Sequence, residues 1–218
     1  MSDWLAWQVV DSAFPVGVFA HSWGLEAAWQ AGHVEDETAL RRFLAESIQQ
    51  TGWSALPLMS AAYERPERLA ELDELNHAFL TNGVANRASR VQGRTLAATA
   101  ARVWPSSAMS DLQARTRAGR AHVAPLSGVV FRTIGLSPET ARKAVLYGAA
   151  RGVLSAAVRL GIVGSYGAQR MQHAAATHLD ATLERCRTLA PEEICQTAPI
   201  IDVLQGAHDR LYSRLFQS

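Results

Sequence analysis

Apolar side chains recur at helical spacing along most of this 218-residue chain. The clearest run is Leu40, Phe43, Leu44, Ser47, Ile48 and Thr51, with arginine, glutamate and glutamine at the positions between them. This rhythm places one apolar stripe along a helix. No stretch alternates apolar and polar residues long enough to indicate a strand, and no hairpin dipeptide separates two such stretches. The sequence therefore predicts an all-α fold.

Capping residues, prolines and glycines divide the chain into predicted helices. Asp36 is a suitable N-cap, and Ser137-Pro138-Glu139 combines an N-cap, a first-turn proline and an acid at the positive end of the helix dipole. We expect helices over 4–12, 22–31, 36–63 (kinked or divided at Gly52 and Pro57), 67–81, 84–103, 126–135, 138–160, 165–189 and 199–214. Residues 105–123 are expected to be a loop around one short helix.

These segments fit one helical bundle-like domain, residues 1–218, of roughly eight to ten helices. We expect the ends, 1–20 and 210–218, to be mobile until a partner binds. On helix 138–160, Gly148, Gly152 and Ala156 form a stripe of small residues. It suits close helix packing, either within the chain or in an oligomer.

Charge and composition exclude several classes of protein. The chain has 21 basic and 20 acidic residues, so the net charge of +1 gives no overall attraction to nucleic acid or to an anionic membrane. No window provides the stretch of about 20 apolar residues that a membrane helix needs. Residues 1–20 lack the basic start of a secretory signal, and Cys186 and Cys195 form no disulfide framework. We expect a cytoplasmic protein.

Motifs for chemistry are missing from the sequence. A P-loop needs Gly-Lys followed by Ser or Thr, and the one lysine, Lys143, lies between Arg142 and Ala144. The histidines show no metal-ligand spacing: His21, His33, His77, His122, His173, His178 and His208. The adjacent His21 and Ser22 do not by themselves make a base and nucleophile pair. We expect neither a catalytic residue nor a bound metal.

The segment Phe14–Glu26, which we call the elbow, joins the first two predicted helices. Pro15 ends the first helix, Gly17 permits a backbone conformation closed to other residues, and Ser22 is the expected N-cap of the second. Gly24 permits close approach of another backbone, and Glu26 suits the start of its helix. We expect the outer surface of the elbow to bind a partner.

Arginine dominates residues 87–120, where seven arginines accompany one acid, Asp111. Arg87, Arg90 and Arg94 share one helical face. This face is either simply solvated or binds an acidic protein. A nucleic-acid partner is disfavoured because interleaved aromatic residues and a helix-turn-helix turn are absent. At the other end, Leu211, Tyr212, Leu215 and Phe216 make an apolar tail that needs a cover, so we expect it to become ordered against a partner.

Several of these stretches resemble the UreF family of urease accessory proteins. The resemblance is specific in Asp11–Gly17, in Phe19–Glu26 with Gly32, and in Thr197-Ala198-Pro199 with His208 and Tyr212–Ser218. Ser89-Arg90, Gly93-Arg94, Leu160–Gly164 and Gln169 are similar as well. The likeness spans nearly the whole chain and is weak between residues 52 and 120.

The resemblance implies a non-catalytic, all-helical, dimeric factor in urease maturation. Such a protein binds UreD (UreH in some systems), recruits the GTPase UreG and the urease apoprotein, and helps deliver nickel without holding it as its own cofactor. The family motif assigns one partner surface to Pro15, Gly17, Phe19, His21, Ser22, Gly24 and Glu26. It assigns the UreD contact to Tyr212, Ser213, Arg214, Leu215 and Phe216, and the GTPase side to Arg90, Gly93 and Arg94.

Two other classes stay open from the residues alone. One is a helical metalloenzyme whose site is assembled from distant histidines. The other is a helical nucleic-acid-binding protein that uses the arginines between residues 87 and 120.

Overall fold

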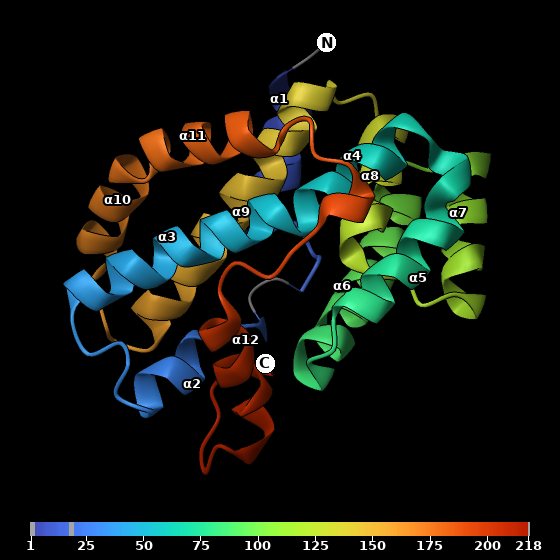
Figure 1. Cartoon of the computed structure of the whole chain (residues 1–218). Helices are drawn as coiled ribbons and strands as arrows, with labels where there is room; N and C mark the ends of the chain where they lie inside the picture. The colour runs from blue at the N-terminus through green and yellow to red at the C-terminus, as the bar shows by residue number, and fades with distance from the viewer. Residues whose placement is uncertain (1–2, 18–19, 218) are drawn as a thin grey trace.

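The computed structural model describes residues 3–17 and 20–217, which form helices and irregular connections with no strand (Figure 1). The α-helices are α1 (Asp3–Val10), α2 (Leu25–Gln30), α3 (Glu37–Trp53), α4 (Ala55–Glu64), α5 (Leu69–Phe79), α6 (Gly83–Val103), α7 (Ser107–Ala118), α8 (Val123–Thr133), α9 (Pro138–Arg159), α10 (Ser165–Ala174), α11 (Ala176–Cys186) and α12 (Pro199–Gly206). Short 3-10 turns are η2 (Pro66–Arg68), η3 (Pro191–Glu193) and η4 (His208–Arg210). The predicted all-α, single-domain class is confirmed.

Two helix starts follow the expected capping chemistry. The side chain of Asp36 accepts the backbone N–H of Ala39 at 2.7 Å to begin α3, and Ser137 begins α9 with Pro138 in its first turn. Residues 105–123 are more helical than expected, because the Ser106 side chain caps the 12-residue helix α7.

The break expected in the helix over 36–63 is confirmed: it is divided into α3 and α4 at Ser54, between Gly52 and Pro57. Two other predicted helices differ from the observed ones. The helix expected over 165–189 bends at Ala175, because Met171 belongs to one hydrophobic core while Leu183 belongs to another. The last helix ends at Gly206 instead of residue 214, so residues 211–217 form an irregular tail.

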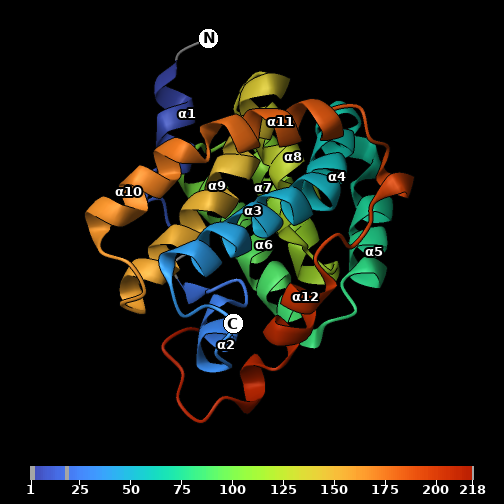
Figure 2. The same cartoon turned by 60° about the vertical axis from the view of Figure 1, so that its left-hand side comes forward.

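Two main hydrophobic cores lie side by side, and α9 contributes to both. Leu146 of α9 packs in the core shared with α4, α6, α7 and α8, whereas Val153 and Ala157 pack in the core shared with α2, α3, α10 and α12. The α3–α4 pair spans the two cores in the same way (Figure 2). A smaller third cluster joins α4, α5 and α8.

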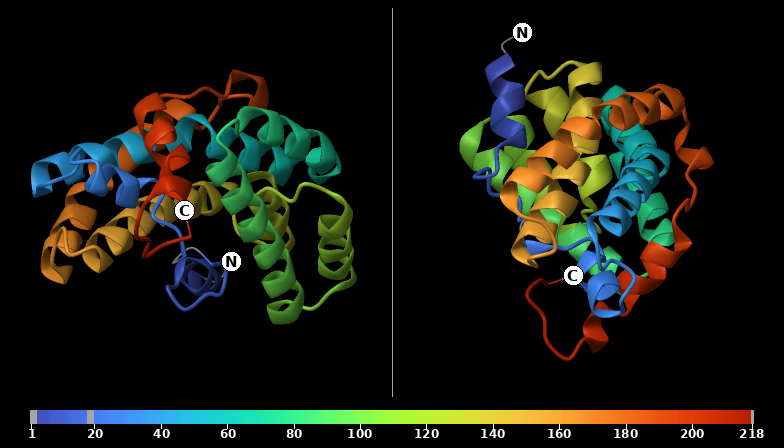
Figure 3. Two further views of the ribbon diagram at one scale, coloured as in Figure 1. Left: turned by 90° about the horizontal axis from the view of Figure 1, so that it is seen from below. Right: turned by 90° about the vertical axis from the view of Figure 1, so that its left-hand side faces the viewer.

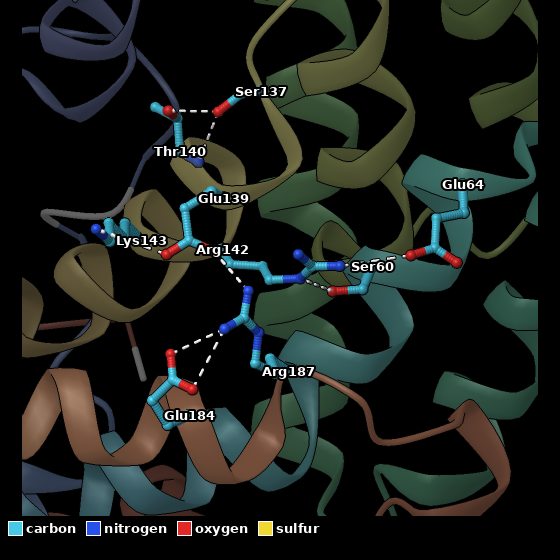
Figure 4. Close-up of polar contacts among 9 residues, drawn as sticks. All are labelled: Ser60, Glu64, Ser137, Glu139, Thr140, Arg142, Lys143, Glu184 and Arg187. Atoms are coloured by element: carbon cyan, nitrogen blue, oxygen red, sulfur yellow. Dashed lines mark hydrogen bonds and ion pairs between the residues drawn. The ribbon is translucent and has the colours of Figure 1, made fainter.

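Side chains also fasten the first turns of α9 to its neighbours (Figure 4). Arg142 Nε donates to Ser60 Oγ of α4 at 3.2 Å. Glu139 forms an ion pair with Arg187, just beyond α11, at 3.7 Å. The position of α9 matters because its C-terminal half packs against the elbow.

The elbow and the tail meet at one end of the molecule. Figure 1 and the right-hand view of Figure 3 show α1 at the opposite end from α12 and the tail. None of the helices in the described ranges has the length and apolar character needed to cross a membrane.

Candidate interaction site

Two consecutive residues with positive φ form the turn of the elbow. Trp23 has a φ of 58° and Gly24 a φ of 85°, both in the left-handed region. A side chain is disfavoured there, which explains glycine at the second position. The prediction that Ser22 caps α2 is wrong: the N-cap position is occupied by Gly24, and no side chain caps the helix. Ser22 is instead fully buried, and its backbone C=O accepts the N–H of Leu25 at 3.0 Å.

Trp23 anchors this turn to α9. A Cβ atom on Gly152 would lie 2.7 Å from Trp23 Nε1, so the indole lies directly against the bare backbone of α9. Gly152 and Ala156 therefore serve packing within the chain, while a Cβ on Gly148 would meet no atom within 4 Å. Gly24 makes a second close contact, because its Cβ would lie 3.1 Å from Gln205 Cβ of α12. This confirms the close backbone approach expected at Gly24.

Glu26 holds the tail against α2. Its Oε1 accepts the backbone N–H of Leu215 at 2.6 Å, and its Oε2 accepts that of Phe216 at 3.2 Å. The backbone N–H of Gln217 donates to the Ala20 C=O at 2.7 Å. A carboxylate with 2 % exposure is tolerated here because two amide donors replace its lost hydration.

The aromatic ring of Phe216 fills the space beneath the tail. Phe216 is buried in the core that contains α2, α3 and part of α9, and the Arg159 guanidinium lies 4.2 Å from its ring centroid. Gln30 Nε2 also donates to the Ser213 C=O at 2.9 Å. The tail is thus seated on its own chain, and its ordering by a partner stays a prediction.

Two buried histidines complete this contact. His208 Nε2 lies 3.1 Å from the Phe216 C=O, and His208 Nδ1 lies 3.8 Å from Glu26 Oε2. Burial, and then the nearby His208, lower the pKa of His21 to about 4. The neutral form of His21 is therefore favoured at pH 7.

The structure brings the predicted elbow and tail residues together but divides them between the interior and the surface. His21, Ser22, Gly24, Glu26 and Phe216 are buried, so they shape and support the site from inside. The exposed members are Pro15, Gly17, Tyr212, Ser213, Arg214 and Leu215. Phe19 lies outside the described residues.

Outward-facing apolar side chains gather on α12 and the tail. Ile200 and Val203 are 68 % and 72 % exposed, Leu215 is 52 % exposed, and Tyr212 is fully exposed. Asp209 pairs with Arg87 of α6 and lies 3.8 Å from Arg214, so ion pairs also link this segment to α6. Exposed apolar residues on consecutive segments are typical of a protein-binding surface.

The second predicted surface lies on α6. Gly93 is buried, and a Cβ atom there would lie 2.0 Å from the Ala121 C=O. Gly93 therefore allows the loop after α7 to pack closely against α6, and its place in a partner contact stays a prediction. Arg94 is exposed and Arg90 is half-buried on the same helix.

Sequence reasoning missed the polar network that positions this loop. The buried Asp73 carboxylate accepts the backbone N–H groups of Ala121 and His122, both at 2.7 Å. His122 Nε2 lies 3.2 Å from His77 Nδ1, and His122 Nδ1 lies 3.1 Å from Ser89 Oγ. Burial is the main reason that the pKa of His122 is lowered to about 4. The positive φ of Ala121, 64°, depends on a backbone geometry that no local pattern indicated.

The histidines do not assemble a recognisable metal cage in the described part of the chain. Within residues 3–17 and 20–217, no three His, Cys, Asp or Glu side chains are grouped so that they could hold an ion. His77 and His122 contact each other directly, and His208 contacts the tail.

Comparison with known proteins identifies the family of this chain. The UreF family model matches residues 34–176. Urease accessory protein F of Arabidopsis thaliana is 40% identical over 99% of this chain and 92% of its own length. The protein of the same name from Oryza sativa subsp. indica is 36% identical over 99% and 85%, and urease accessory protein UreF of Arthrobacter sp. is 32% identical over 97% and 95%. This chain therefore belongs to the UreF family.

Proposed function

We propose that the protein is a non-catalytic accessory factor in the maturation of urease. The proposal is supported by family membership and by relatives of nearly the same length that are named urease accessory proteins. In this role the chain binds other proteins and brings them into one complex. Nickel is the cargo of that complex and is not a resident cofactor of this chain.

The surface formed by α12 and the tail is the site that we assign to UreD or UreH. Its supporting observation is the pair of hydrogen bonds from Leu215 and Phe216 to Glu26, which seats the tail against α2. Such contacts limit the conformational entropy that the tail loses on binding. Tyr212 and Leu215 then provide exposed side chains of the kind that anchor interfaces.

The remaining partners belong to the same proposal. We assign the α6 surface around Arg90 and Arg94 to the GTPase UreG, and we propose that UreG and UreD or UreH jointly receive the urease apoprotein. The chain acts as a homodimer in the cytoplasm. Neither nucleic acid nor a membrane is a proposed partner, because the net charge is only +1.

Co-purification tests this function. The chain is produced together with the UreD and UreG proteins of its own source, and the mass of the complex is measured by light scattering. We expect a stable complex that contains all three proteins. Absence of any complex, or turnover of GTP by the isolated chain, would contradict the proposal.

Substitutions locate the UreD contact. Tyr212→Ala combined with Leu215→Ala should weaken UreD binding at least about 10-fold, since buried aromatic anchors each contribute more than about 1 kcal/mol. Tyr166→Ala is the matched control, because Tyr166 is 84 % exposed and belongs to α10, a helix that lies away from the tail (Figure 1). Deletion of residues 212–218 should also abolish binding. Unchanged binding after this deletion would refute the assignment of the tail.

A further inference from the structure

Three arginines from two separate segments surround the loop that Gly93 admits. Arg90 and Arg94 lie one turn apart on α6, on either side of Gly93, and Arg120 directly precedes Ala121. Because Ala121 C=O lies against Gly93, Arg120 is brought beside the two arginines of α6. All three guanidinium groups act electrostatically on His122, which agrees with this grouping. We call Arg90, Arg94 and Arg120 the arginine patch.

The patch has more positive charge than its own chain neutralises. Helix α6 contains four arginines and no acidic residue. Among the seven arginines between residues 87 and 120, only Arg87 and Arg120 form ion pairs with acids in the described parts of the chain. The Nε of Arg90 is buried and has no hydrogen-bond partner among those residues. That buried atom is closed to a partner, whereas Arg94 is exposed and forms no ion pair with an acid within the described residues, so its guanidinium is open to a partner's carboxylate.

One carboxylate of the chain already occupies the edge of the patch. Glu74 of α5 lies 3.2 Å from Arg120 Nε, and both side chains are largely exposed, at 64% and 45%. An exposed pair of this kind is weak and exchanges its partner readily. Glu74 therefore shows where a carboxylate fits, and it also competes with any carboxylate that arrives from a partner.

We propose that the arginine patch binds an acidic segment of a protein partner, and that Glu74 is an internal competitor for Arg120. Resting on the proposed function, the partner is the GTPase. An acidic protein fits better than nucleic acid because Val91, 49% exposed, lies between Arg90 and Arg94. Arginine mixed with apolar side chains is typical of protein interfaces, whereas nucleic acid needs an extended basic field.

Charge-changing variants test this inference in the complex. The chain is first bound to UreD, and this step reports on the proposed function alone. UreG is then titrated at low and at high salt. We expect Arg94→Glu to weaken UreG binding at least about 10-fold, as charge reversal at an interface does. We expect Glu74→Gln to strengthen it about 2- to 5-fold, because the competing ion pair is lost.

Controls separate the inference from a loss of folding and from the wrong partner. Arg42→Ala removes an exposed arginine of α3 and should leave UreG binding unchanged. The helical circular dichroism signal of all variants should match that of the parent chain. Normal UreD binding with UreG affinity that responds to neither Arg94→Glu nor Glu74→Gln would overturn the inference and leave the proposed function intact. Tighter binding of a 20-base-pair DNA duplex than of UreG, lost in Arg94→Glu, would also overturn it in favour of nucleic acid.

Discussion

The carboxylate of Glu26 accepts the backbone N–H of Leu215 at 2.6 Å, although 189 positions separate the two residues in the sequence. This bond joins the start of α2 to the tail, and the neighbouring N–H of Phe216 donates to the same carboxylate. The two motifs that most resemble the family are therefore parts of one contact. The buried residues of the two motifs, such as Glu26 and Phe216, hold the exposed residues of the tail in place.

Glu26→Gln should release the tail while leaving the helices folded. The variant loses the charge that strengthens both hydrogen bonds, and bonds to a charged group contribute about 1.5–3 kcal/mol. Hydrogen exchange measured by mass spectrometry should show the 211–217 amides exchanging at least about 10-fold faster. Glu67→Gln, at an exposed position in η2, is the control. Equal protection of the tail in both variants would contradict the role of Glu26.

Substitution of Gly24 should disturb the elbow and assembly more than the helical content. Gly24→Ala forces a side chain into a left-handed conformation, at a cost of about 1–2 kcal/mol, and brings a methyl group to 3.1 Å from Gln205 Cβ. Gly24→Trp should abolish complex formation with UreD while circular dichroism still reports a helical monomer. A Gly24→Trp complex that elutes normally from a sizing column would count against this prediction.

A methyl group at Gly93 should separate α6 from the loop at Ala121. The new Cβ would lie 2.0 Å from a backbone oxygen, which no rotamer change can relieve. We expect Gly93→Ala to reduce the free energy of unfolding by at least about 2 kcal/mol, and to lower UreG binding. Gly148→Ala is the matched helical control: it meets no atom within 4 Å and should be neutral or stabilising by about 0.5–1 kcal/mol. Urea unfolding of both variants measures the difference.

Acid should destabilise the protein through His21 and His122. The pKa of each is lowered from 6.5 to about 4, so the unfolded chain binds more protons between these values. The free energy of unfolding should therefore be highest above pH 6.5 and should fall as the pH drops towards 4. Each histidine contributes at most about 1.4 kcal/mol per pH unit. Urea midpoints that stay constant between pH 7 and 5, or NMR titration of both histidines near 6.5, would contradict this.

Local chemistry accounts for the part of the fold that the sequence predicted. Asp36 and Ser137 are helix starts because their side chains satisfy free backbone N–H groups nearby in the sequence. The left-handed glycine at position 17 was also indicated, since few other residues adopt that conformation. The bend at Ala175 was not predictable in this way. It depends on two cores that exist only after the whole chain has packed.

The candidate site was predicted as a set of residues but not as an arrangement. Sequence similarity pointed to Glu26 and Phe216 without indicating that they touch. The Asp73 carboxylate gave no signal, because its two partners are backbone groups 48 and 49 positions away. Arg120 was seen only as one arginine of a run. Its grouping with Arg90 and Arg94 requires the close approach at Gly93.

The bare backbone at Gly93 has a consequence for how binding defects in this family are interpreted. A screen that scores lost association would assign position 93 to the contact area, although its α-carbon faces the protein's own loop. Such a variant would lose partner binding indirectly. The displaced loop would move apart the charged groups that a partner contacts. Surface variants and buried variants of the same short motif should therefore be distinguished by their unfolding free energies before either is mapped onto a docking face.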